Sequence, residues 1–296
     1  MGPESSLLES IQNGLSDALE ESLDVNWVRN LHGGDINQAA LIRSGNTDWF
    51  LKYHRNASRD MFAAEAQALE EISRQGCIRV PCPIAHGSDG DTTWLVLEYL
   101  EMIPRGPSAL LGEQLAAMHA VTADCHGWTR DNFIGSTPQY NSCNGDWIEF
   151  WRDCRMKPQF EMAEKNVYGG RLAGPGEKLL AAMDQLLDGH KPAASLLHGD
   201  LWAGNKAFTP AGEPVIFDPA TYYGDRETDI AMTGLFGGFG TEFYSAYEAH
   251  SPLPNGYQLR RELYNLYHLL NHFNLFGGGY LSRCEHIINR LLAEVR

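Results

Sequence analysis

An aspartate and an asparagine stand five residues apart in residues 198–205, which read His-Gly-Asp-Leu-Trp-Ala-Gly-Asn and follow an apolar segment. Residues 215–218 read Val-Ile-Phe-Asp and are typical of a second short strand that ends in a carboxylate. Taken alone, the first stretch could be a turn before a strand, since Gly and Asn both favour turns. The combination of two apolar strands, each followed by polar oxygen-bearing side chains, favours one compact site built from Asp200, Asn205 and Asp218.

This spacing is the one that catalytic loops of kinases use. In those loops the Asp accepts the proton of the attacking hydroxyl, and the Asn supplies an uncharged oxygen to a magnesium ion on the nucleotide. A second carboxylate on a neighbouring strand provides the main metal ligand. The pattern therefore predicts Asp200 as the catalytic base, and Asn205 and Asp218 as the ligands of Mg²⁺.

Composition agrees with a compact soluble enzyme. The chain has 296 residues, 43% hydrophobic and 21% charged, which is enough for one large or two modest domains. A formal charge of −15 disfavours nucleic acid as a partner, because a phosphate backbone requires a basic face. No apolar run reaches the roughly 18 to 20 residues that cross a bilayer, and the acidic residues 1–9 do not resemble a signal peptide. We expect a cytoplasmic protein without membrane association.

The cysteines indicate neither a metal site nor a disulfide. None forms a C-x-x-C pair, and none has a histidine at metal spacing. We therefore expect reduced thiols at all six positions: Cys77, Cys82, Cys125, Cys143, Cys154 and Cys284.

The first hundred residues read as a helix followed by a β-rich region. Apolar residues at helical spacing predict an amphipathic helix over 5–23, and strands are expected over 25–31, 36–43 and 49–53. The turn at 32–35 is either an ordinary hairpin or a loop whose glycines let backbone N–H groups approach a nucleotide phosphate. Its position one hairpin before a strand lysine favours the second interpretation. The candidate phosphate-loop residues are Gly33, Gly34, Asp35, Ile36 and Asn37.

Lys52 lies inside the apolar strand 49–53, and Glu65 falls on the apolar stripe of a helix predicted over 58–74. A strand lysine can point to solvent, and a glutamate can lie at the edge of a stripe. However, an unpaired charge in a core is very costly, so a Lys52–Glu65 ion pair explains both positions. In kinases such a pair orients the lysine toward the α- and β-phosphates.

A buried strand over 92–100 precedes a change to helical patterns, broken by Pro and Gly near 104–107. The sequence therefore predicts an α+β, two-lobed protein kinase-like fold. Residues 1–100 would form a small β-rich ATP-binding lobe, and residues 101–296 a larger, mainly helical catalytic and substrate lobe. The linker of such a fold offers backbone groups to adenine, which makes Glu98, Tyr99 and Leu100 candidate contacts. Helices are expected over 106–121, 146–166, 176–187, 228–236, 241–250, 258–276 and 281–295.

In these motifs the chain resembles the fructosamine kinase family, also called the ketosamine-3-kinases. This family is related to the aminoglycoside and choline kinases. The resemblance covers nearly the whole chain, and the Trp of the His-Gly-Asp-Leu-Trp form is its most specific mark. It is carried by residues 33–37, 50–52, 61–65, 80–83, 110–115, 131–135, 137–139, 198–205 and 223–229.

The resemblance implies transfer of the γ-phosphate of ATP to the C3 hydroxyl of a ketosamine, with Mg²⁺ as the metal. The 3-phosphate then breaks down, the sugar leaves as a deoxyosone, and the amine is regenerated, so the role would be deglycation. A related kinase that acts on an aminoglycoside, choline or another amino alcohol would keep the same ATP residues and is the alternative. The expected substrate is a free or protein-bound ketosamine, and the expected state is a monomer or weak homodimer.

The resemblance also suggests roles for the remaining residues. Trp202 would close the substrate site, although a Trp that braces the loop explains it nearly as well. Asp229 and His198 would hold the catalytic loop rather than take part in the chemistry. Asp35 departs from the Cys that many eukaryotic members carry in the glycine loop, so a thiol switch in that loop is not expected here.

Overall fold

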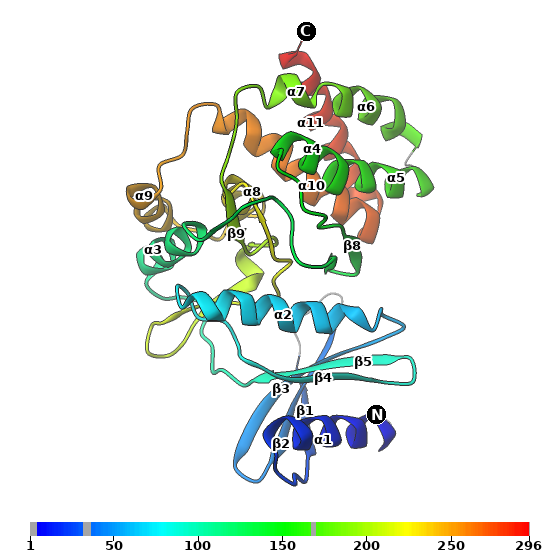
Figure 1. Ribbon diagram of the computed structural model, residues 1–296, viewed down its shortest axis with the longest axis vertical. Coiled ribbons are helices and arrows are strands. Elements are labelled where there is room, and N and C mark those ends of the chain that lie inside the picture. Colours follow the sequence, from blue (N-terminus) through cyan, green and yellow to red (C-terminus); the bar gives the residue numbers. More distant parts are fainter. Residues whose placement is uncertain (1–4, 32–36, 167–169, 296) are drawn as a thin grey trace. The chain divides into compact units, whose positions relative to one another are not determined.

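The chain folds into two compact units in the computed structural model, which describes residues 5–31, 37–166 and 170–295 (Figure 1). The N-terminal unit comprises residues 1–107 together with 206–219, and the C-terminal unit comprises 108–205 and 220–296. The first boundary lies at 107/108, where the sequence suggested 100/101, and the chain also returns to the N-terminal unit for 14 residues (206–219). The assignment of nucleotide and substrate binding to separate lobes stays a prediction.

The N-terminal unit is built on a five-stranded antiparallel sheet with the order β1-β2-β3-β5-β4. Its elements are α1 (Ser5–Leu19), β1 (Asn26–Leu31), β2 (Gln38–Ser44), β3 (Thr47–Arg55), α2 (Asp60–Gln75), β4 (Pro83–Asp89), β5 (Thr92–Glu98), β10 (Lys206–Phe208) and β11 (Pro214–Ile216). The predicted opening helix is real but four residues shorter at its end, because Glu20 takes a left-handed φ of 53°. Strand β4 had no clear periodic signal in the sequence.

Strand β3 shows why one lysine can be buried in this sheet. Side chains alternate between the two faces of a strand, and Trp49 and Leu51 pack into the apolar core formed with α1. Lys52 therefore points to the opposite face, where its ammonium lies 5.8 Å from the ring centre of Phe62 in α2. Figure 1 shows α1 and α2 on opposite faces of the sheet.

The hairpin β10–β11 belongs to the N-terminal unit by its hydrogen bonds. Ile103 and Phe208 exchange backbone hydrogen bonds of 2.7 and 2.9 Å, and the N–H of Ile216 donates to the carbonyl of Arg79 at 3.0 Å. The hairpin is thereby bonded to the segment before β4, through Arg79, and to the segment after β5, through Ile103. This arrangement fixes the position of Asp218, two residues after β11, within the same unit as Lys52.

The C-terminal unit is mainly helical, as predicted, around a small antiparallel sheet with the order β12-β9-β6. Its elements are α3 (Ser108–His119), β6 (Thr122–Ala123), β7 (Asn132–Ile134), β8 (Thr137–Gln139), α4 (Trp147–Phe150), the π-helix η1 (Trp151–Met156), α5 (Lys157–Lys165), α6 (Gly170–Ala181), α7 (Met183–Leu186), β9 (Ala194–Leu197), the 3₁₀ turn η2 (Ala203–Asn205), β12 (Tyr222–Gly224), α8 (Glu227–Leu235), α9 (Thr241–His250), α10 (Tyr257–Phe276), the 3₁₀ turn η3 (Gly278–Tyr280) and α11 (Leu281–Glu294).

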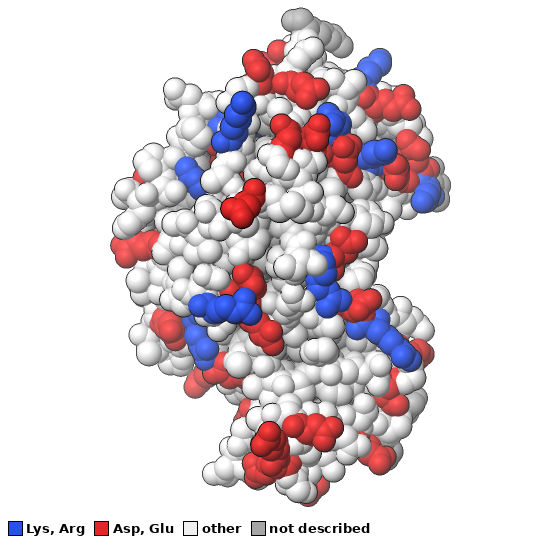
Figure 2. All heavy atoms as spheres, in the orientation of Figure 1, with Lys and Arg blue, Asp and Glu red and all other residues white. Residues whose placement is uncertain are grey.

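Acidic and basic side chains are interspersed over the face shown in Figure 2, consistent with 38 acidic against 23 basic residues. Within the described ranges, none of the helices has the length and apolarity that crossing a membrane requires.

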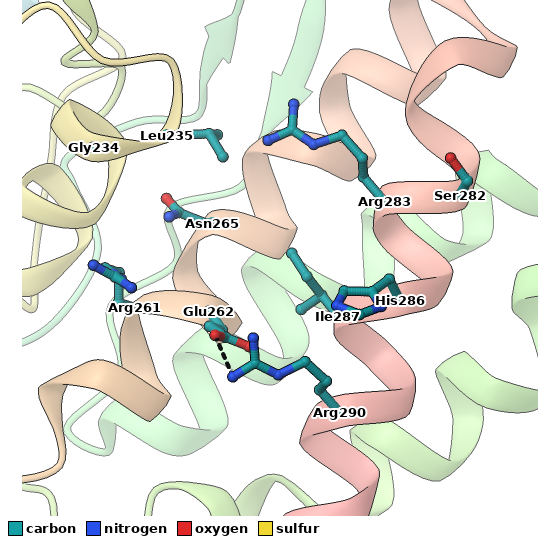
Figure 3. A pocket seen from close by; sticks show the side chains of 10 residues that line it. All are labelled: Gly234, Leu235, Arg261, Glu262, Asn265, Ser282, Arg283, His286, Ile287 and Arg290. Atoms are coloured by element: carbon teal, nitrogen blue, oxygen red, sulfur yellow. Dashed lines mark ion pairs between the residues drawn. The ribbon is translucent and has the colours of Figure 1, made fainter.

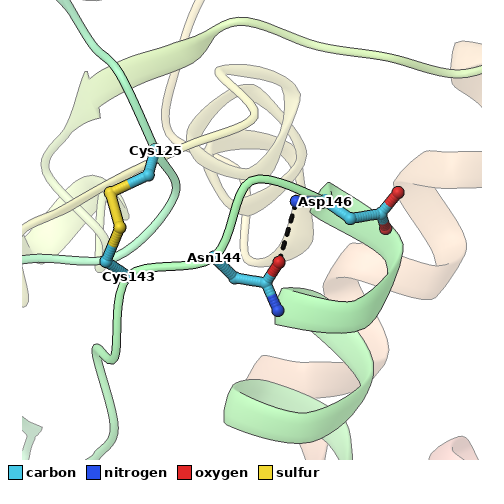
Figure 4. Close-up of a disulfide and its surroundings, with 4 residues drawn as sticks. All are labelled: Cys125, Cys143, Asn144 and Asp146. Carbon is cyan, nitrogen blue, oxygen red and sulfur yellow. Dashed lines mark hydrogen bonds between the residues drawn. A yellow bond between two sulfur atoms is a disulfide. The ribbon is translucent and has the colours of Figure 1, made fainter.

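The prediction that all cysteines are free thiols is wrong in the structure. Cys125 and Cys143 form a disulfide with their Cα atoms 5.7 Å apart (Figure 4). The bond closes a loop with a sequence separation of 18, and no short motif marks such a pairing in the sequence. Directly after Cys143, the side chain of Asn144 accepts a 2.8 Å hydrogen bond from the N–H of Asp146, the residue that caps α4.

Loss of the disulfide is expected to destabilise the C-terminal unit. A cross-link closing a loop of this size contributes about 3 kcal/mol by restricting the unfolded chain. The double substitution Cys125→Ser/Cys143→Ser should therefore lower the unfolding midpoint, whereas Cys82→Ser, at an exposed free thiol, serves as the matched control.

A thiol titration of the denatured, unreduced protein gives the direct count. Four free thiols are expected from six cysteines minus the two that are bonded. Six titratable thiols, together with a midpoint that a reductant does not change, would show that the bond does not form.

Candidate active site

Lys52 lies between two carboxylates in the N-terminal unit. Its Nζ donates to Oε1 of Glu65 at 2.6 Å and to Oδ1 of Asp218 at 2.9 Å. The predicted Lys52–Glu65 pair is thus present, and Lys52 is only 4% exposed. Burial acts to lower the pKa of Lys52, but Asp218 and Glu65 outweigh it and raise the pKa above its ordinary value. Burial, the largest cause, and the nearby Asp218 raise the pKa of Glu65. The lysine is therefore held charged and oriented.

Asp218 has the geometry of a residue placed for a ligand. It adopts a left-handed φ of 57°, which is uncommon for a residue other than Gly and is tolerated by Asp. Its side chain is 44% exposed, although Oδ1 is taken by Lys52. An exposed carboxylate with one oxygen neutralised by lysine matches the hard oxygen donor that Mg²⁺ prefers.

The loop that carries Asp200 begins in the C-terminal unit where β9 ends. Gly199 has a φ of 84°, and a Cβ there would lie 2.1 Å from the carbonyl oxygen of Ala220, so only Gly fits. The N–H groups of His198 and Gly199 donate to the carboxylate of Asp229 at 2.7 and 2.8 Å. These two hydrogen bonds tie the start of the loop to α8.

A chain of buried polar groups extends from Asp229. Its Oδ2 lies 3.1 Å from Nε2 of His119, whose Nδ1 lies 2.8 Å from the hydroxyl of Tyr247. Burial acts to raise the pKa of Asp229, but the hydrogen bond with His119 and the N–H of Gly199 outweigh it and lower the pKa. His198 accepts a 3.2 Å hydrogen bond from the N–H of Asp200 at Nδ1. Both histidines thus support the loop.

Asp200 and Asn205 are bonded within the loop. The amide nitrogen of Asn205 donates to the backbone carbonyl of Asp200 at 2.9 Å and to its Oδ2 at 3.3 Å. Because the amide nitrogen is used in this way, the oxygen Oδ1 of Asn205 faces away from Asp200. Asn205 is only 6% exposed, and its two hydrogen bonds to Asp200 hold the side chain in one orientation.

Trp202 folds back over its own loop. A Cβ at Gly204 would lie 2.3 Å from the indole, so the ring covers that glycine. The indole also meets Phe236 edge-to-face, with ring centres 6.3 Å apart. The ring is half-buried rather than fully enclosed. The structure thus gives Trp202 a bracing contact, and its contact with substrate stays a prediction.

The segment after Asp218 is held by two side chains that the sequence interpretation missed, and the N–H of Ala220 in this segment donates to the carbonyl of His198 at 2.8 Å. Asn132 and Gln139, in the hairpin β7–β8, donate to the carbonyls of Thr221 and Ala220 at 2.7 and 2.9 Å. Gln139 accepts in turn from the hydroxyl of Tyr267 at 2.7 Å. Both polar side chains are at most 4% exposed. Buried amides of this kind look like loop residues in a sequence, so only the three-dimensional contacts show their role.

One other cluster has metal-ligating residue types, namely His190, Asp225 and Glu227. Its carboxylates are already paired, because Arg260 binds both oxygens of Glu227 at 2.7 Å, and Asp225 Oδ2 accepts from Tyr264 and contacts Nε2 of His190 at 2.6 Å. We interpret this cluster as a buried hydrogen-bond and ion-pair network that supports α8 and α10.

The structure is informative about only part of the predicted nucleotide contacts. Residues 33–36 of the glycine turn lie outside the described residues, and Asn37 contributes Oδ1 to a 3.1 Å contact with Nδ1 of His54. The side chain of Glu98 pairs with Arg79 and accepts from the N–H of Cys82 at 3.2 Å. The N–H of Glu98 donates to the carbonyl of Cys82 at 2.8 Å, so any adenine contact of Glu98 would be made by its backbone carbonyl. Adenine contacts of Tyr99 and Leu100 stay predictions.

The lysine with its helix glutamate, the loop with Asp and Asn, and the aspartate after the following hairpin define a protein of the kinase-like class. A solved structure of choline kinase LicA from Streptococcus pneumoniae shares this fold, with a TM-score of 0.63 at 15% identity over 98% of this chain and 100% of that chain. A provisionally named fructosamine-3-kinase from Haemophilus somnus matches more closely, with a TM-score of 0.88 at 28% identity over 95% and 96% of the two chains.

Within this class the chain belongs to the fructosamine kinase family, whose model matches residues 7–294. It is 41% identical over 287 residues to a "Probable ketoamine kinase" of Synechocystis, covering 96% of each chain. It is 39% identical over 276 residues to a chloroplastic protein-ribulosamine 3-kinase of Oryza sativa, covering 92% of this chain and 80% of that protein. The family and fold expected from the sequence are confirmed, and the protein is a kinase.

Proposed function

We propose that this protein transfers the γ-phosphate of ATP to the C3 hydroxyl of ketosamines and thereby starts the removal of sugar from glycated amines. The observation that carries the proposal is the family match over 7–294, combined with an unbroken set of the residues that phosphoryl transfer requires. These residues are Lys52, Glu65, Asp200, Asn205 and Asp218.

The nucleotide side of the proposal rests on Lys52. A buried ammonium can donate to phosphate oxygens, and its two carboxylate partners hold it in one orientation. Gly33, Gly34, Asp35 and Ile36 would cover the phosphates with Asn37, and the backbone from Glu98 to Leu100 would contact adenine. These assignments follow the family resemblance and the strand order.

Asn205 and Asp218 would hold Mg²⁺. Both supply oxygen donors, and the orientation of Asn205 leaves its Oδ1 directed away from Asp200. Two protein oxygens with phosphates and water complete the octahedral shell that this ion prefers. When bound, the ion would neutralise charge on the phosphates.

Asp200 would act on the acceptor. Its carboxylate accepts the proton of the C3 hydroxyl while the bond between that oxygen and the γ-phosphorus forms and the bond from phosphorus to the ADP oxygen breaks. The main-chain hydrogen bonds from His198 and Gly199 to Asp229 keep Asp200 in place. Trp202 would present the free part of its ring to the sugar or the amine.

An acceptor panel tests this proposal. ATP consumption is measured with ribulosyl-lysine, fructosyl-lysine, choline and an aminoglycoside at equal concentration, in the presence of Mg²⁺. Turnover with at least one of the two ketosamines is expected, with little or none for choline and the aminoglycoside. Turnover with choline or the aminoglycoside alone would refute the ketosamine assignment and support the alternative acceptor class.

A cytoplasmic location and a monomeric or weakly dimeric state stay predictions.

A further inference from the structure

A cavity of about 470 Å³ lies in the C-terminal unit, among the end of α8, helix α10 and helix α11. Figure 3 shows side chains from α10 on one side and from α11 on the other. Three arginines line it, Arg261, Arg283 and Arg290, in a chain whose formal charge is −15. A local concentration of guanidinium groups in so acidic a protein points to an anion as the ligand.

The three arginines differ in what they already bind. Arg290 is paired with Glu262 Oε1 at 2.8 Å, as Figure 3 shows. Arg283 lies with its guanidinium carbon 6.0 Å from the ring centre of Phe236, and it makes no hydrogen bond or ion pair with the residues that the structure describes. Arg261 has no hydrogen bond or ion pair within the described part of the chain. Arg261 and Arg283 therefore have donors to offer, and planar guanidinium groups suit phosphate oxygens.

The wall of the cavity also holds two acceptors that lack donors. Asn265 is 9% exposed, and its Oδ1 has no hydrogen-bond partner among the residues the structure describes. Oε2 of Glu262, three residues earlier on the same face of α10, is also buried and without a partner there. A buried acceptor without a donor is unfavourable, so these atoms favour a ligand that brings donors.

We propose that this cavity is a binding site for a small phosphorylated sugar or polyol. The phosphate would bind to Arg261 and Arg283, and hydroxyl groups would donate to Oδ1 of Asn265 and Oε2 of Glu262. The lining residues belong neither to the loop 198–205 nor to the Lys52 cluster. Phe236, which Arg283 approaches, is the nearest link to that loop, because its ring also contacts Trp202. A neutral sugar lacks the anion, and inorganic phosphate lacks the carbon-bound hydroxyl groups that would reach these acceptors while the phosphate binds the arginines.

Isothermal titration of the full chain with glucose 6-phosphate, inorganic phosphate and glucose tests the site. The titrations are done with a saturating non-hydrolysable ATP analogue and Mg²⁺, so that the nucleotide site is occupied. Glucose 6-phosphate should bind most tightly, inorganic phosphate more weakly, and glucose weakest of all. Equal affinities for inorganic phosphate and glucose 6-phosphate would overturn the sugar assignment. If neither of these two anions binds, the proposed site is wrong.

Variants then locate the binding. Arg261→Ala/Arg283→Ala should weaken glucose 6-phosphate at least about tenfold, because each charge-assisted hydrogen bond contributes that much. Both residues are exposed, so the fold should persist. Arg74→Ala removes an exposed arginine from α2, and the affinity should stay within about twofold of the parent. Asn265→Ala should remove the preference for glucose 6-phosphate over inorganic phosphate. An unchanged affinity in the double variant would place the ligand elsewhere.

Discussion

Replacement of Asp200 by Asn is expected to lower kcat about 10³-fold while leaving the affinity for ATP nearly unchanged. The amide has the shape of the carboxylate but cannot accept the proton of the acceptor hydroxyl, and general bases contribute roughly 10²- to 10⁴-fold. Hydrogen bonds from Asn205 reach the backbone carbonyl of Asp200 as well as its carboxylate, so the loop should keep its conformation. Single-turnover kinetics would measure the chemical step, and titration with ATP would measure binding.

Asp184→Asn is the matched control for this result. It makes the same chemical change in the C-terminal unit at a side chain that is 73% exposed. Activity within about twofold of the parent is expected, since a surface ion pair such as that of Asp184 with Arg152 at 3.9 Å contributes little. An Asp200→Asn enzyme with more than about a tenth of the parental kcat would remove Asp200 from the role of base.

The second large effect is expected at Lys52. Lys52→Met preserves the length of the side chain but removes the ammonium that Glu65 and Asp218 hold. We expect kcat/KM for ATP to fall about 10²- to 10³-fold, as when a preorganised donor to the transition state is lost. The variant should also lose stability, because removing one partner of a buried ion pair leaves Glu65 uncompensated at a site that is almost closed to water.

A double substitution separates the two consequences. In Lys52→Met/Glu65→Gln the buried carboxylate is gone, so most of the lost unfolding free energy should return, whereas the activity should not. Thermal unfolding and ATP kinetics of the same preparations give both values. Restored activity in the double variant would mean that Lys52 serves the fold and not the nucleotide.

The sequence predicted much of this molecule because its strongest signals are local. Helices α9 and α10 lie within one residue of their predicted bounds, since apolar spacing and flanking Gly or Pro residues mark them. The ion pair of Lys52 and Glu65 could also be predicted, because each charge stands on an otherwise apolar face where only a partner makes it tolerable.

Other features depend on contacts between distant segments. Asn132 and Gln139 bind the backbone carbonyls of Thr221 and Ala220, which are more than 80 positions away in the sequence. Neither a hydrophobic period nor a sequence motif predicts these contacts. The disulfide between Cys125 and Cys143 requires the fold to bring the two chain segments together. Residues 206–219 belong to the N-terminal unit. Isolated β-bridges pair Val215 with Arg79 and Phe208 with Ile103, and an isolated bridge leaves no pattern in the sequence. Such pairings become visible only in three dimensions.

The proposed reaction is tested most directly by locating the phosphate on the product. The enzyme is incubated with ribulosyl-lysine, ATP and Mg²⁺, and phosphorus–proton correlation NMR identifies the carbon that carries the new phosphate. The phosphorus is expected to couple to the proton on C3, followed by release of inorganic phosphate and free lysine as the product decomposes. A phosphate on any other hydroxyl, or ATP hydrolysis without sugar phosphorylation, would contradict the ketosamine 3-kinase assignment.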